Sequence, residues 1–378
     1  MAEPTPLPKS VTERIGALDG VRGIAILLVL AGHVVANFQP LSPEFRYWLG
    51  AFANSNAGVR LFFVLSGYLI TWLLLREWTA TGRISIGQFY RRRALRIFPA
   101  FYAYLLILAG LTFLWPTGVN EQTFLAAATF TWNYHHLWVS IPPEGAWNLG
   151  HLWTLALEQQ FYLFWPALLV WAGRTRATWA AAALALGCPI IRVLTHLLLP
   201  EQRGYSGMML HSAIDGLMIG CAAALMADHP AVSTALQRHG KRFVLSAIAW
   251  LALASPALGA SVRGFPVAIG FTLDAIAAAW LILWLHRAAP PRATRWLDKG
   301  PLAALGTISY SLYLWQQPFL SNTGPLRHGQ VFLPLVAALV VAVLSYRFIE
   351  QPFLRLKHSP SRILPPFAAG NSGVKPAH

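Results

Sequence analysis

LDGVRGIAILLVLAGHVV, residues 18–35, is the stretch that decides the fold of this 378-residue chain. It is a run of Ile, Leu, Val and Ala, with Asp19 and Arg22 at one end and His33 near the other. On an α-helix, Arg22 and His33 lie within about 20° of the same face and about 16 Å apart along the axis. A helix this apolar belongs in a bilayer, where an ionisable side chain marks a functional site. The alternative is a histidine that only hydrogen-bonds to a neighbouring helix.

The composition of the whole chain is that of a helical membrane protein. Hydrophobic residues make up 56% of it and charged residues 11%. We predict an all-α bundle in which residues 1–17 are a cytoplasmic N-terminal segment, 18–356 the transmembrane domain and 357–378 a short disordered cytoplasmic tail. Apolar runs long enough to cross a bilayer predict about ten spans, at 19–37, 59–77, 97–115, 150–172, 177–199, 207–227, 243–260, 265–286, 301–321 and 331–350.

The net charge of +15 is explained by topology rather than by nucleic-acid binding. With the N-terminus cytoplasmic and ten spans, 23 of the 29 Lys and Arg residues fall on the inner side, as the positive-inside rule requires. We therefore expect both termini in the cytoplasm, membrane lipids as the surroundings and no nucleic-acid partner. The HEXXH motif and the Cys and His spacings typical of metal-binding motifs are absent from the sequence. No metal site is therefore expected.

A basic block, RRRALRIFP at residues 91–99, precedes the third predicted span. Arg93 and Arg96 are three residues apart and share a helix face. The forked guanidinium group suits phosphate binding, and the sequence contains no P-loop or GxGxxG motif. The block predicts a cytoplasmic site for a phosphorylated donor such as coenzyme A or a nucleotide. The alternative is simple anchoring at the inner membrane surface.

The segment GHLWTLALEQQFYLFWP, residues 150–166, carries a second group of polar and aromatic side chains. His151 and Glu158 are seven residues apart and share a helix face, with Trp153 and Tyr162 near it. A carboxylate beside aromatic rings suits the binding of a sugar-like hydroxyl acceptor. The alternative is an aromatic belt at the membrane interface.

Two other patterns are weaker indications of a catalytic site. His211 and Asp215 match the HxxxD pattern of some soluble acyltransferases, but they lie inside a predicted span, where the open channel of those enzymes is not expected. Asp215 remains of interest as a carboxylate at membrane depth. Ser66 is predicted to be a small helix-packing residue rather than a nucleophile.

Several segments together resemble the integral-membrane acyltransferase-3 family. They are LDGVRGIAILLVLAGH (18–33), GVRLFFVLSGYLI (58–70), RRALRIFPAFY (92–102), HLWTLALEQQFYLFWP (151–166), DGLMIG (215–220), ISYSLYLWQQPF (308–319) and RFIEQPF (347–353). The resemblance implies a ten-span enzyme of the bacterial cytoplasmic (inner) membrane. Such enzymes move an acyl group, usually acetyl, from acyl-CoA onto carbohydrate or macrolide hydroxyls.

The resemblance also implies roles for individual residues. The family's essential membrane histidine corresponds to His33, its paired arginines to Arg93 and Arg96, and its fourth-span glutamate to Glu158. Many relatives carry a histidine where this chain has Gln316. That histidine is not available here, so His33 becomes the stronger candidate for the catalytic base. Many relatives also carry an appended hydrolase-like domain, and the short tail predicts the stand-alone form.

We therefore expect acetyl transfer from cytoplasmic acyl-CoA, with no permanently bound cofactor, to a hydroxyl of a surface polysaccharide, lipopolysaccharide or glycosylated metabolite. The donor phosphates would contact Arg22, Arg93 and Arg96. His33, which burial is expected to keep neutral, would deprotonate the acceptor or take the acyl group itself. The side chains expected to bind the acceptor are His151, Trp153, Tyr162 and Asp215.

Two other functions fit parts of the pattern. One is a transporter or flippase that moves a glycolipid or acylated sugar along the same polar face. The crowding of motifs in the first four predicted spans suits a reaction centre better than a symmetric pathway. The other is a glycosyltransferase that uses polyprenyl-linked sugars. It would be expected to carry acidic pairs in early outer loops, and Asp19 lies on the wrong side for that role.

Overall fold

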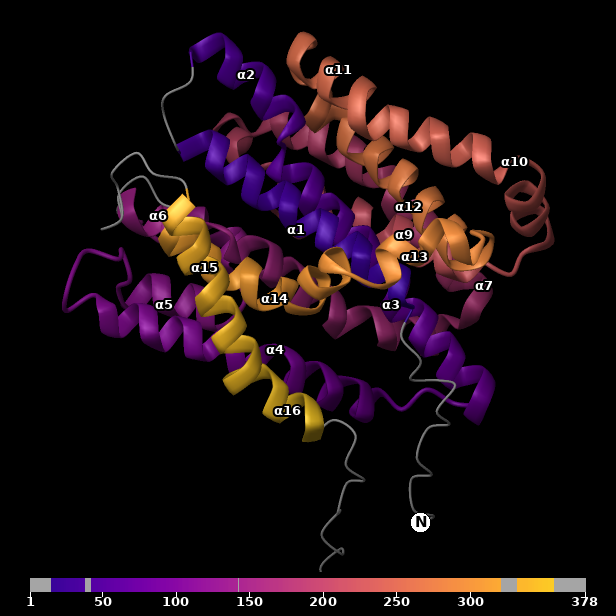
Figure 1. Cartoon of the computed structure of the whole chain (residues 1–378), viewed down its shortest axis with the longest axis horizontal. Coiled ribbons are helices and arrows are strands. Elements are labelled where there is room, and N and C mark those ends of the chain that lie inside the picture. Colours follow the sequence, from indigo (N-terminus) through magenta and orange to yellow (C-terminus); the bar gives the residue numbers. More distant parts are fainter. Residues whose placement is uncertain (1–14, 38–41, 142, 321–331, 357–378) are drawn as a thin grey trace, which may run out of the picture.

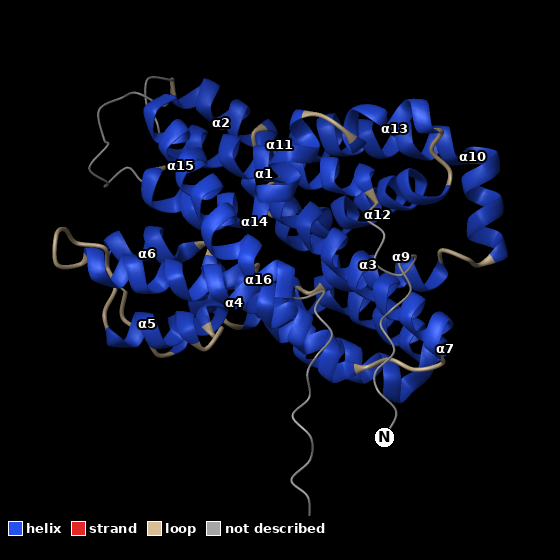
Figure 2. Ribbon diagram, turned by 60° about the horizontal axis from the view of Figure 1, so that its bottom comes forward, coloured by secondary structure: helices blue, strands red, loops and turns tan. Residues whose placement is uncertain are grey.

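The structure is a computed structural model that describes residues 15–37, 42–141, 143–320 and 332–356. Within these ranges every regular element is a helix, which confirms the all-α prediction. Figure 2 shows the helices joined mostly by short loops. The predicted tail at 357–378 and most of the predicted N-terminal segment lie outside the described residues.

The helices follow one another along the chain as labelled in Figure 1. The first half contains α1 (Gly16–Asn37), α2 (Pro43–Phe52), α3 (Ser55–Thr81), α4 (Ile86–Leu111), α5 (Glu121–Ala128), the 3₁₀ helix η2 (Trp132–Leu137), α6 (Pro143–Gly150) and α7 (Leu152–Leu198). The second half contains η3 (Pro200–Tyr205), α8 (Leu210–Ala213), α9 (Asp215–Met226), α10 (Pro230–Ala249), η4 (Trp250–Ala254), α11 (Ser255–Ser261), η5 (Pro266–Gly270), α12 (Phe271–Arg287), α13 (Pro291–Asp298), α14 (Pro301–Phe319), α15 (Phe332–Ser345), η6 (Tyr346–Glu350) and α16 (Gln351–Leu356).

Seven helical stretches of the described chain are long and apolar enough to cross a membrane. One of them, 147–198, contains two of the predicted spans, because Gly173 (φ 73°, ψ 171°) breaks α7 between them. Two more predicted spans fall on α9, which has 12 residues, and on α14, which carries buried serine, tyrosine and glutamine. The predicted count of ten spans is therefore not confirmed by helix length and composition.

Helix α1 lies in the middle of the bundle and packs against α3 on one side and α14 on the other. The contact with α14 brings the two backbones together. A side chain at Gly306 would overlap the backbone carbonyl oxygen of Asp19, and one at Gly23 would overlap that of Leu302. Small residues at a helix crossing allow this close approach in membrane proteins. The crossing is what brings polar side chains of α1 and α14 within hydrogen-bonding distance.

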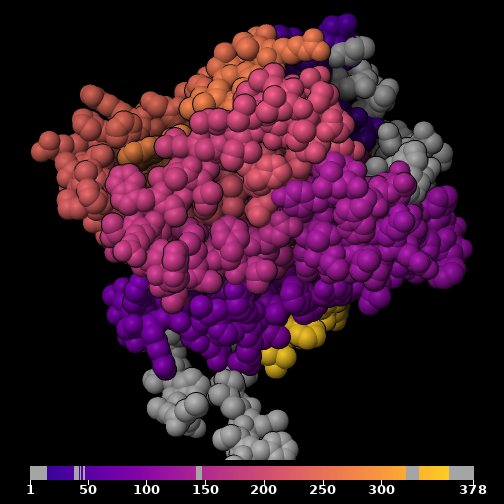
Figure 3. All heavy atoms as spheres, turned by 180° about the vertical axis from the view of Figure 1, so that it is seen from behind, coloured from indigo at the N-terminus to yellow at the C-terminus, as the bar shows by residue number. Residues whose placement is uncertain are grey.

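Helix α7 covers much of the rear of the molecule, shown in pink in Figure 3. Its outward side chains are large and apolar, as expected of a surface that faces lipid tails. Among them, Trp171 is 82% exposed and Trp179 is 73% exposed. The short helices α2, α5 and α6 lie at the left-hand end of the bundle in Figures 1 and 2, and α10 begins at the right-hand end. The polar residues of interest lie between these ends.

Candidate active site

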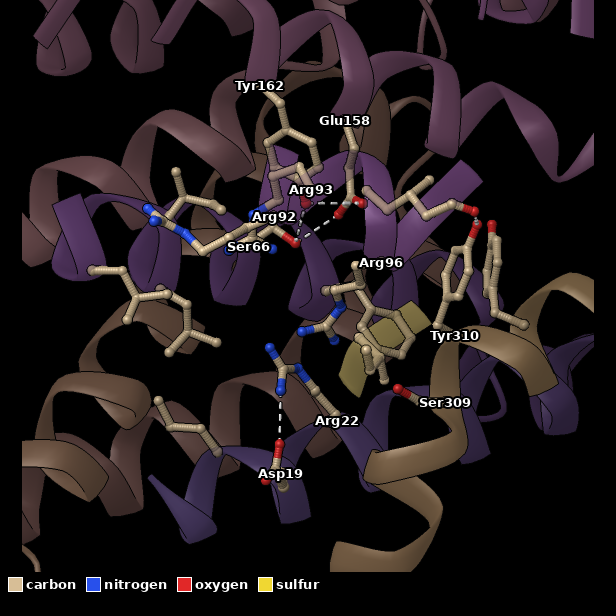
Figure 4. Close-up of a pocket in the computed structure, with 18 of the residues that line it drawn as sticks. Asp19, Arg22, Ser66, Arg92, Arg93, Arg96, Glu158, Tyr162, Ser309 and Tyr310 are labelled. Atoms are coloured by element: carbon tan, nitrogen blue, oxygen red, sulfur yellow. Dashed lines mark hydrogen bonds and ion pairs between the residues drawn. The ribbon is translucent and has the colours of Figure 1, made fainter. Parts of the chain in front are cut away.

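A cavity of about 600 Å³ opens between α1, α3, α4, α7, α14 and the final helices of the described chain. This volume lies within the range of small-molecule sites in proteins. Figure 4 shows the polar side chains that point into it. The charged members are Asp19, Arg22, Glu77, Arg92, Arg93, Arg96, Glu158, Glu350 and Arg355. Three helices that are remote in sequence, α1, α4 and α7, therefore bring the predicted arginines and Glu158 to one place.

The arginines of the cavity fall into two groups. Arg22 pairs with Asp19 at 2.7 Å, and Arg92 pairs with Glu77 at 2.8 Å. In the described part of the chain, no carboxylate lies within ion-pair distance of Arg93 or Arg96. Figure 4 shows the guanidinium groups of Arg22 and Arg96 pointing into the same space. Arg93 and Arg96 are thus available to an anionic ligand, with Arg22 beside them.

Arg93 is held in place by aromatic rings rather than by an acid. Its guanidinium carbon lies 5.5 Å from the ring centre of Tyr162 and 5.6 Å from that of Phe89. Contacts of this kind attract a cation without neutralising it. The positive charge of Arg93 is therefore retained for a ligand. Tyr162 lines the same cavity beside it.

Glu158 joins α7 to α3 at the wall of the cavity. It accepts a hydrogen bond from the Ser66 hydroxyl at 2.7 Å and a second from the Tyr162 hydroxyl at 3.3 Å. Ser66 was predicted to be a small helix-packing residue rather than a nucleophile, and its hydrogen bond to this carboxylate adds a contact that the prediction did not include. The next residue, Gly67, makes the close helix contact, because a side chain there would overlap the Leu217 carbonyl oxygen. Nothing in the LSGY sequence distinguishes the residue that hydrogen-bonds, Ser66, from the residue that packs closely, Gly67.

The cavity ends at a buried pair of hydroxyl groups on α7 and α14. Thr154 and Tyr313, whose hydroxyl oxygens are 2.7 Å apart, both line it. Both hydroxyl oxygens also lie within hydrogen-bonding distance of the backbone carbonyl oxygen of His151, at 2.9 and 3.2 Å. The His151 ring itself does not line the cavity: its Nε2 lies 3.1 Å from the Leu314 carbonyl oxygen. His151 and Glu158, predicted to act together, are thus separated by the Thr154–Tyr313 pair.

His33 lies outside the cavity lining and contacts α14 and α6. Its Nδ1 is 2.8 Å from the side-chain oxygen of Gln316. Its ring meets that of Trp147 edge-on, with centres 5.3 Å apart. The structure thus brings His33 close to His151, near enough for their charges to interact. It does not place His33 in the same cavity as Arg22, although both lie on α1.

Between α4 and α7, the described part of segment 116–149 packs against α7 through η2 and carries several aromatic rings. The Asn133 and Gln160 side-chain amides bond each other reciprocally, at 2.9 and 3.0 Å, and fix η2 to α7. The His135 ring stacks on Trp132, and the His136 ring stacks on Tyr205 with centres 4.0 Å apart. Burial lowers the pKa of His135 and of His136 from the ordinary histidine value, so both rings are neutral near pH 7.

Asp215, which was expected to bind the acceptor, lies among buried polar side chains away from the cavity. Its carboxylate is fully buried, 3.0 Å from Arg192 and 3.7 Å from Arg60, and it accepts a hydrogen bond from Thr272 at 2.6 Å. This arrangement is that of a structural ion cluster, and Asp215 does not line the cavity. His211 does not contact it, because the His211 ring lies against Tyr134 instead.

Trp153 is also outside the cavity, since its ring packs edge-on against Phe63 in the core. Among the side chains expected to bind the acceptor, only Tyr162 lines the cavity, and it does so beside Arg93. Their predicted roles stay predictions. The residues that sequence reasoning missed are Ser66, Thr154 and Tyr313, which carry only a hydroxyl group and belong to no charged pattern.

Residues 15–346 match the family model described as an acyltransferase domain, that of the acyltransferase-3 family. The chain belongs to this family. The match includes α1 with His33, α4 with Arg93 and Arg96, and α14 with Gln316. Together with seven apolar helices, it makes the protein an integral membrane protein. Family membership does not favour the transporter or the glycosyltransferase interpretation.

Curated relatives of this acyltransferase-3 chain are named as O-acetyltransferases. It is 29% identical to the peptidoglycan O-acetyltransferase OatA of Listeria monocytogenes, over 89% of this chain and 55% of the relative. It is also 29% identical to the putative peptidoglycan O-acetyltransferase YrhL of Bacillus subtilis, over 89% and 54%. A putative O-acetyltransferase of Staphylococcus aureus, SACOL0978, is 29% identical over 90% and 57%. The chain thus spans about half the length of these relatives. No solved structure matches it.

Proposed function

We propose that this protein is a membrane O-acetyltransferase that moves an acetyl group from cytoplasmic acetyl-CoA to a hydroxyl of a carbohydrate acceptor. The observation that carries the proposal is the pair Arg93 and Arg96, which lines a cavity of about 600 Å³ with no carboxylate within ion-pair distance among the described residues. Its family and the printed activities of its relatives point to the same reaction.

The donor is assigned to the cavity by charge. Coenzyme A carries several phosphate groups, and guanidinium groups bind phosphate oxygens through paired, charge-assisted hydrogen bonds. Arg93 and Arg96 are the primary candidates, and Arg22 adds a third guanidinium beside them. The apolar walls from α1 and α3 suit the uncharged arm that ends in the thioester.

The acceptor is assigned to the opposite side of the Thr154–Tyr313 pair. His33 and His151 lie there, and the aromatic rings of segment 116–149 suit stacking against a sugar. The relatives from Listeria and Bacillus are named for peptidoglycan, a carbohydrate polymer. We propose a polysaccharide or other glycosylated hydroxyl compound as the class of acceptor.

The reaction that follows needs no oxidant and no second nucleotide. The acceptor oxygen forms a bond to the acetyl carbon, and the carbon–sulfur bond of the thioester breaks. His33 takes the proton of the hydroxyl, and the departing thiolate receives a proton in return. In a two-step variant, His33 first carries the acetyl group and then passes it to the acceptor.

The topology proposed with this reaction is ten spans in the bacterial cytoplasmic membrane, with both termini in the cytoplasm. The break at Gly173 supports counting α7 as two spans, and the central burial of α14 supports counting it as another. This arrangement gives Arg93 and Arg96 access to a cytoplasmic donor.

The experiment is a transfer assay with purified protein in lipid nanodiscs, 14C-acetyl-CoA and soluble peptidoglycan fragments. We expect labelled acetyl ester on the carbohydrate, with one free coenzyme A thiol released for each ester formed. A reconstituted protein that moves a glycolipid across vesicles without consuming acetyl-CoA would overturn the proposal in favour of a transporter.

A further inference from the structure

Gln316 and Gln317 form a chain of amide hydrogen bonds that begins at His33 and ends on the backbone of Trp147. The side-chain oxygen of Gln316 is 2.8 Å from His33 Nδ1, and its Nε2 is 3.4 Å from the side-chain oxygen of Gln317. Gln317 Nε2 donates to the Trp147 carbonyl oxygen at 2.9 Å. Both glutamines are buried, so water does not compete for these contacts.

The direction of this chain is fixed at its Trp147 end. A backbone carbonyl has no hydrogen to donate, so the group of Gln317 that contacts it must be the amide nitrogen. The other end of Gln317 is then its oxygen, which accepts a hydrogen bond from the Gln316 nitrogen. The Gln316 oxygen is left facing His33. Because a carbonyl oxygen only accepts, Nδ1 of His33 must carry the hydrogen.

Further contacts hold this arrangement in place. The indole nitrogen of Trp147 donates to the backbone carbonyl of Gln317 at 2.8 Å, so α6 and α14 are bonded in both directions. The same indole ring lies edge-on to the His33 ring. The orientation of the imidazole is therefore set by two neighbours, one polar and one aromatic.

A neutral imidazole that carries its hydrogen on Nδ1 has its lone pair on Nε2. Within the described chain, Nε2 of His33 makes no hydrogen bond, and the ring is only half-buried. Building on the function proposed above, we infer that Gln316 is a positioning residue that holds His33 as the Nδ1–H tautomer. Nε2 is then the atom that takes the proton from the acceptor hydroxyl.

The glutamine has a physical advantage over a histidine at this position. An amide does not titrate, so Gln316 presents the same acceptor oxygen at every pH at which the protein is folded. A histidine there would change its donors and acceptors as it gained a proton near pH 6.5. The tautomer of His33 is thus set independently of pH for as long as the ring stays neutral.

The direct test is 15N NMR of the whole chain in lipid nanodiscs, with 15N-labelled histidine at pH 8. The His33 signals are identified by their absence from the spectrum of His33→Gln. We expect an Nδ1 shift typical of a nitrogen that carries hydrogen and an Nε2 shift typical of a bare nitrogen. The reverse assignment in the unmodified protein overturns the inference, and this measurement depends on no variant at residue 316.

Two variants then connect the tautomer to the reaction. Gln316→Leu keeps a similar size but removes the acceptor, and we expect the hydrogen to move to Nε2 and kcat to fall about 10²-fold, the scale on which misplaced general bases act. The KM for acetyl-CoA should change by less than about twofold, because the donor cavity is untouched. Gln316→Glu restores an accepting oxygen, and it should keep Nδ1–H and kcat within about tenfold of the parent. An unchanged kcat in Gln316→Leu overturns the inference.

Failure of this inference is separable from failure of the proposed function. Absence of acetyl transfer by the unmodified protein would contradict the proposed function. Full turnover in His33→Ala would contradict the assignment of His33 as the base and leave the proposed acetyl transfer standing. An inactive His33→Ala together with a hydrogen on Nε2 in the unmodified protein would contradict the role of Gln316 alone.

Discussion

The hydroxyl of Ser66 on α3 donates a hydrogen bond to the carboxylate of Glu158 on α7 at 2.7 Å, across 92 positions of the sequence. Tyr162 binds the other carboxylate oxygen, and Arg93 and Arg96 lie close enough for their charges to act on it. This contact fixes a carboxylate at the wall of the cavity that holds Arg93 and Arg96. Its position there, rather than beside His151, supports the proposal that Glu158 acts on the donor side.

Glu158→Gln tests this assignment. The amide has the same size but carries no charge, so the cavity becomes more positive while its shape is kept. We expect kcat to fall at least about tenfold, since a charged hydrogen-bond partner contributes about 1.5–3 kcal/mol. Steady-state rates with acetyl-CoA as the varied substrate are the measurement. Ser66→Ala, which keeps the charge and removes one donor, should show a smaller loss. Equal losses in both variants would contradict a role for the charge.

Arg96→Ala is expected to weaken donor binding. Loss of one charge-assisted phosphate contact should raise the KM for acetyl-CoA about tenfold or more, with kcat within about threefold of the parent. Arg91→Ala is the matched control, because Arg91 lies on the same helix but outside the cavity. Similar KM values for the two variants would show that the arginines only anchor α4 at the membrane surface.

The sequence predicted the fold class and four of the nine charged residues of the cavity, namely Arg22, Arg93, Arg96 and Glu158. An apolar run with charges at its ends defines a membrane helix without reference to its neighbours, which is why α1, α3 and α4 could be predicted. The proximity of Arg22, Arg96 and Glu158 depends on how α1, α4 and α7 are placed around the cavity. Spacing along the sequence does not reveal that placement.

The contacts of Asp215 and Ser66 could not be predicted for one physical reason, because their partners are remote in sequence. Asp215 was expected to contact substrate because a carboxylate in a membrane helix is costly. Its cost is met by Arg192, Arg60 and Thr272, which are remote in sequence and are not predictable as its partners. Ser66 was predicted to pack rather than to act as a nucleophile, and its hydrogen bond to Glu158, 92 positions away, could not be predicted from the local sequence.

Asp215→Asn is expected to affect stability rather than donor binding. Removing the carboxylate leaves Arg60 and Arg192 buried without their counter-ion, a loss of about 3–5 kcal/mol for pairs of this kind. Thermal unfolding followed by tryptophan fluorescence should show a clear fall in Tm, with the KM for acetyl-CoA unchanged in the folded fraction. Asp228→Asn is the control: Asp228 pairs with Arg287 at an exposed site, where such pairs contribute about 0–1 kcal/mol. A raised KM for the peptidoglycan fragments with normal stability in Asp215→Asn would support its predicted role in binding the acceptor.

Gly306→Ala tests the crossing of α1 and α14. The added methyl group would overlap the Asp19 carbonyl oxygen, so the helices must separate, and overpacking of this kind costs about 1–3 kcal/mol or more. We expect a lower Tm together with a lower kcat, because His33 and Gln316 face each other across the same pair of helices. Gly187→Ala, on the second half of α7, meets no atom within 4 Å and should leave both quantities unchanged or raise Tm slightly. Normal activity in Gly306→Ala would show that the crossing does not position the site.

The central claim is that His33 carries out the proton transfer of acetylation, and His33→Ala tests it most directly. The measurement is the initial rate of 14C-acetyl transfer from acetyl-CoA to peptidoglycan fragments in lipid nanodiscs. His196→Ala, at an exposed position of α7, is measured beside it as the control. We predict that His33→Ala lowers the rate at least about 10²-fold while the protein stays folded and binds acetyl-CoA, and that His196→Ala keeps the parent rate. Near-normal transfer by folded His33→Ala would contradict the account.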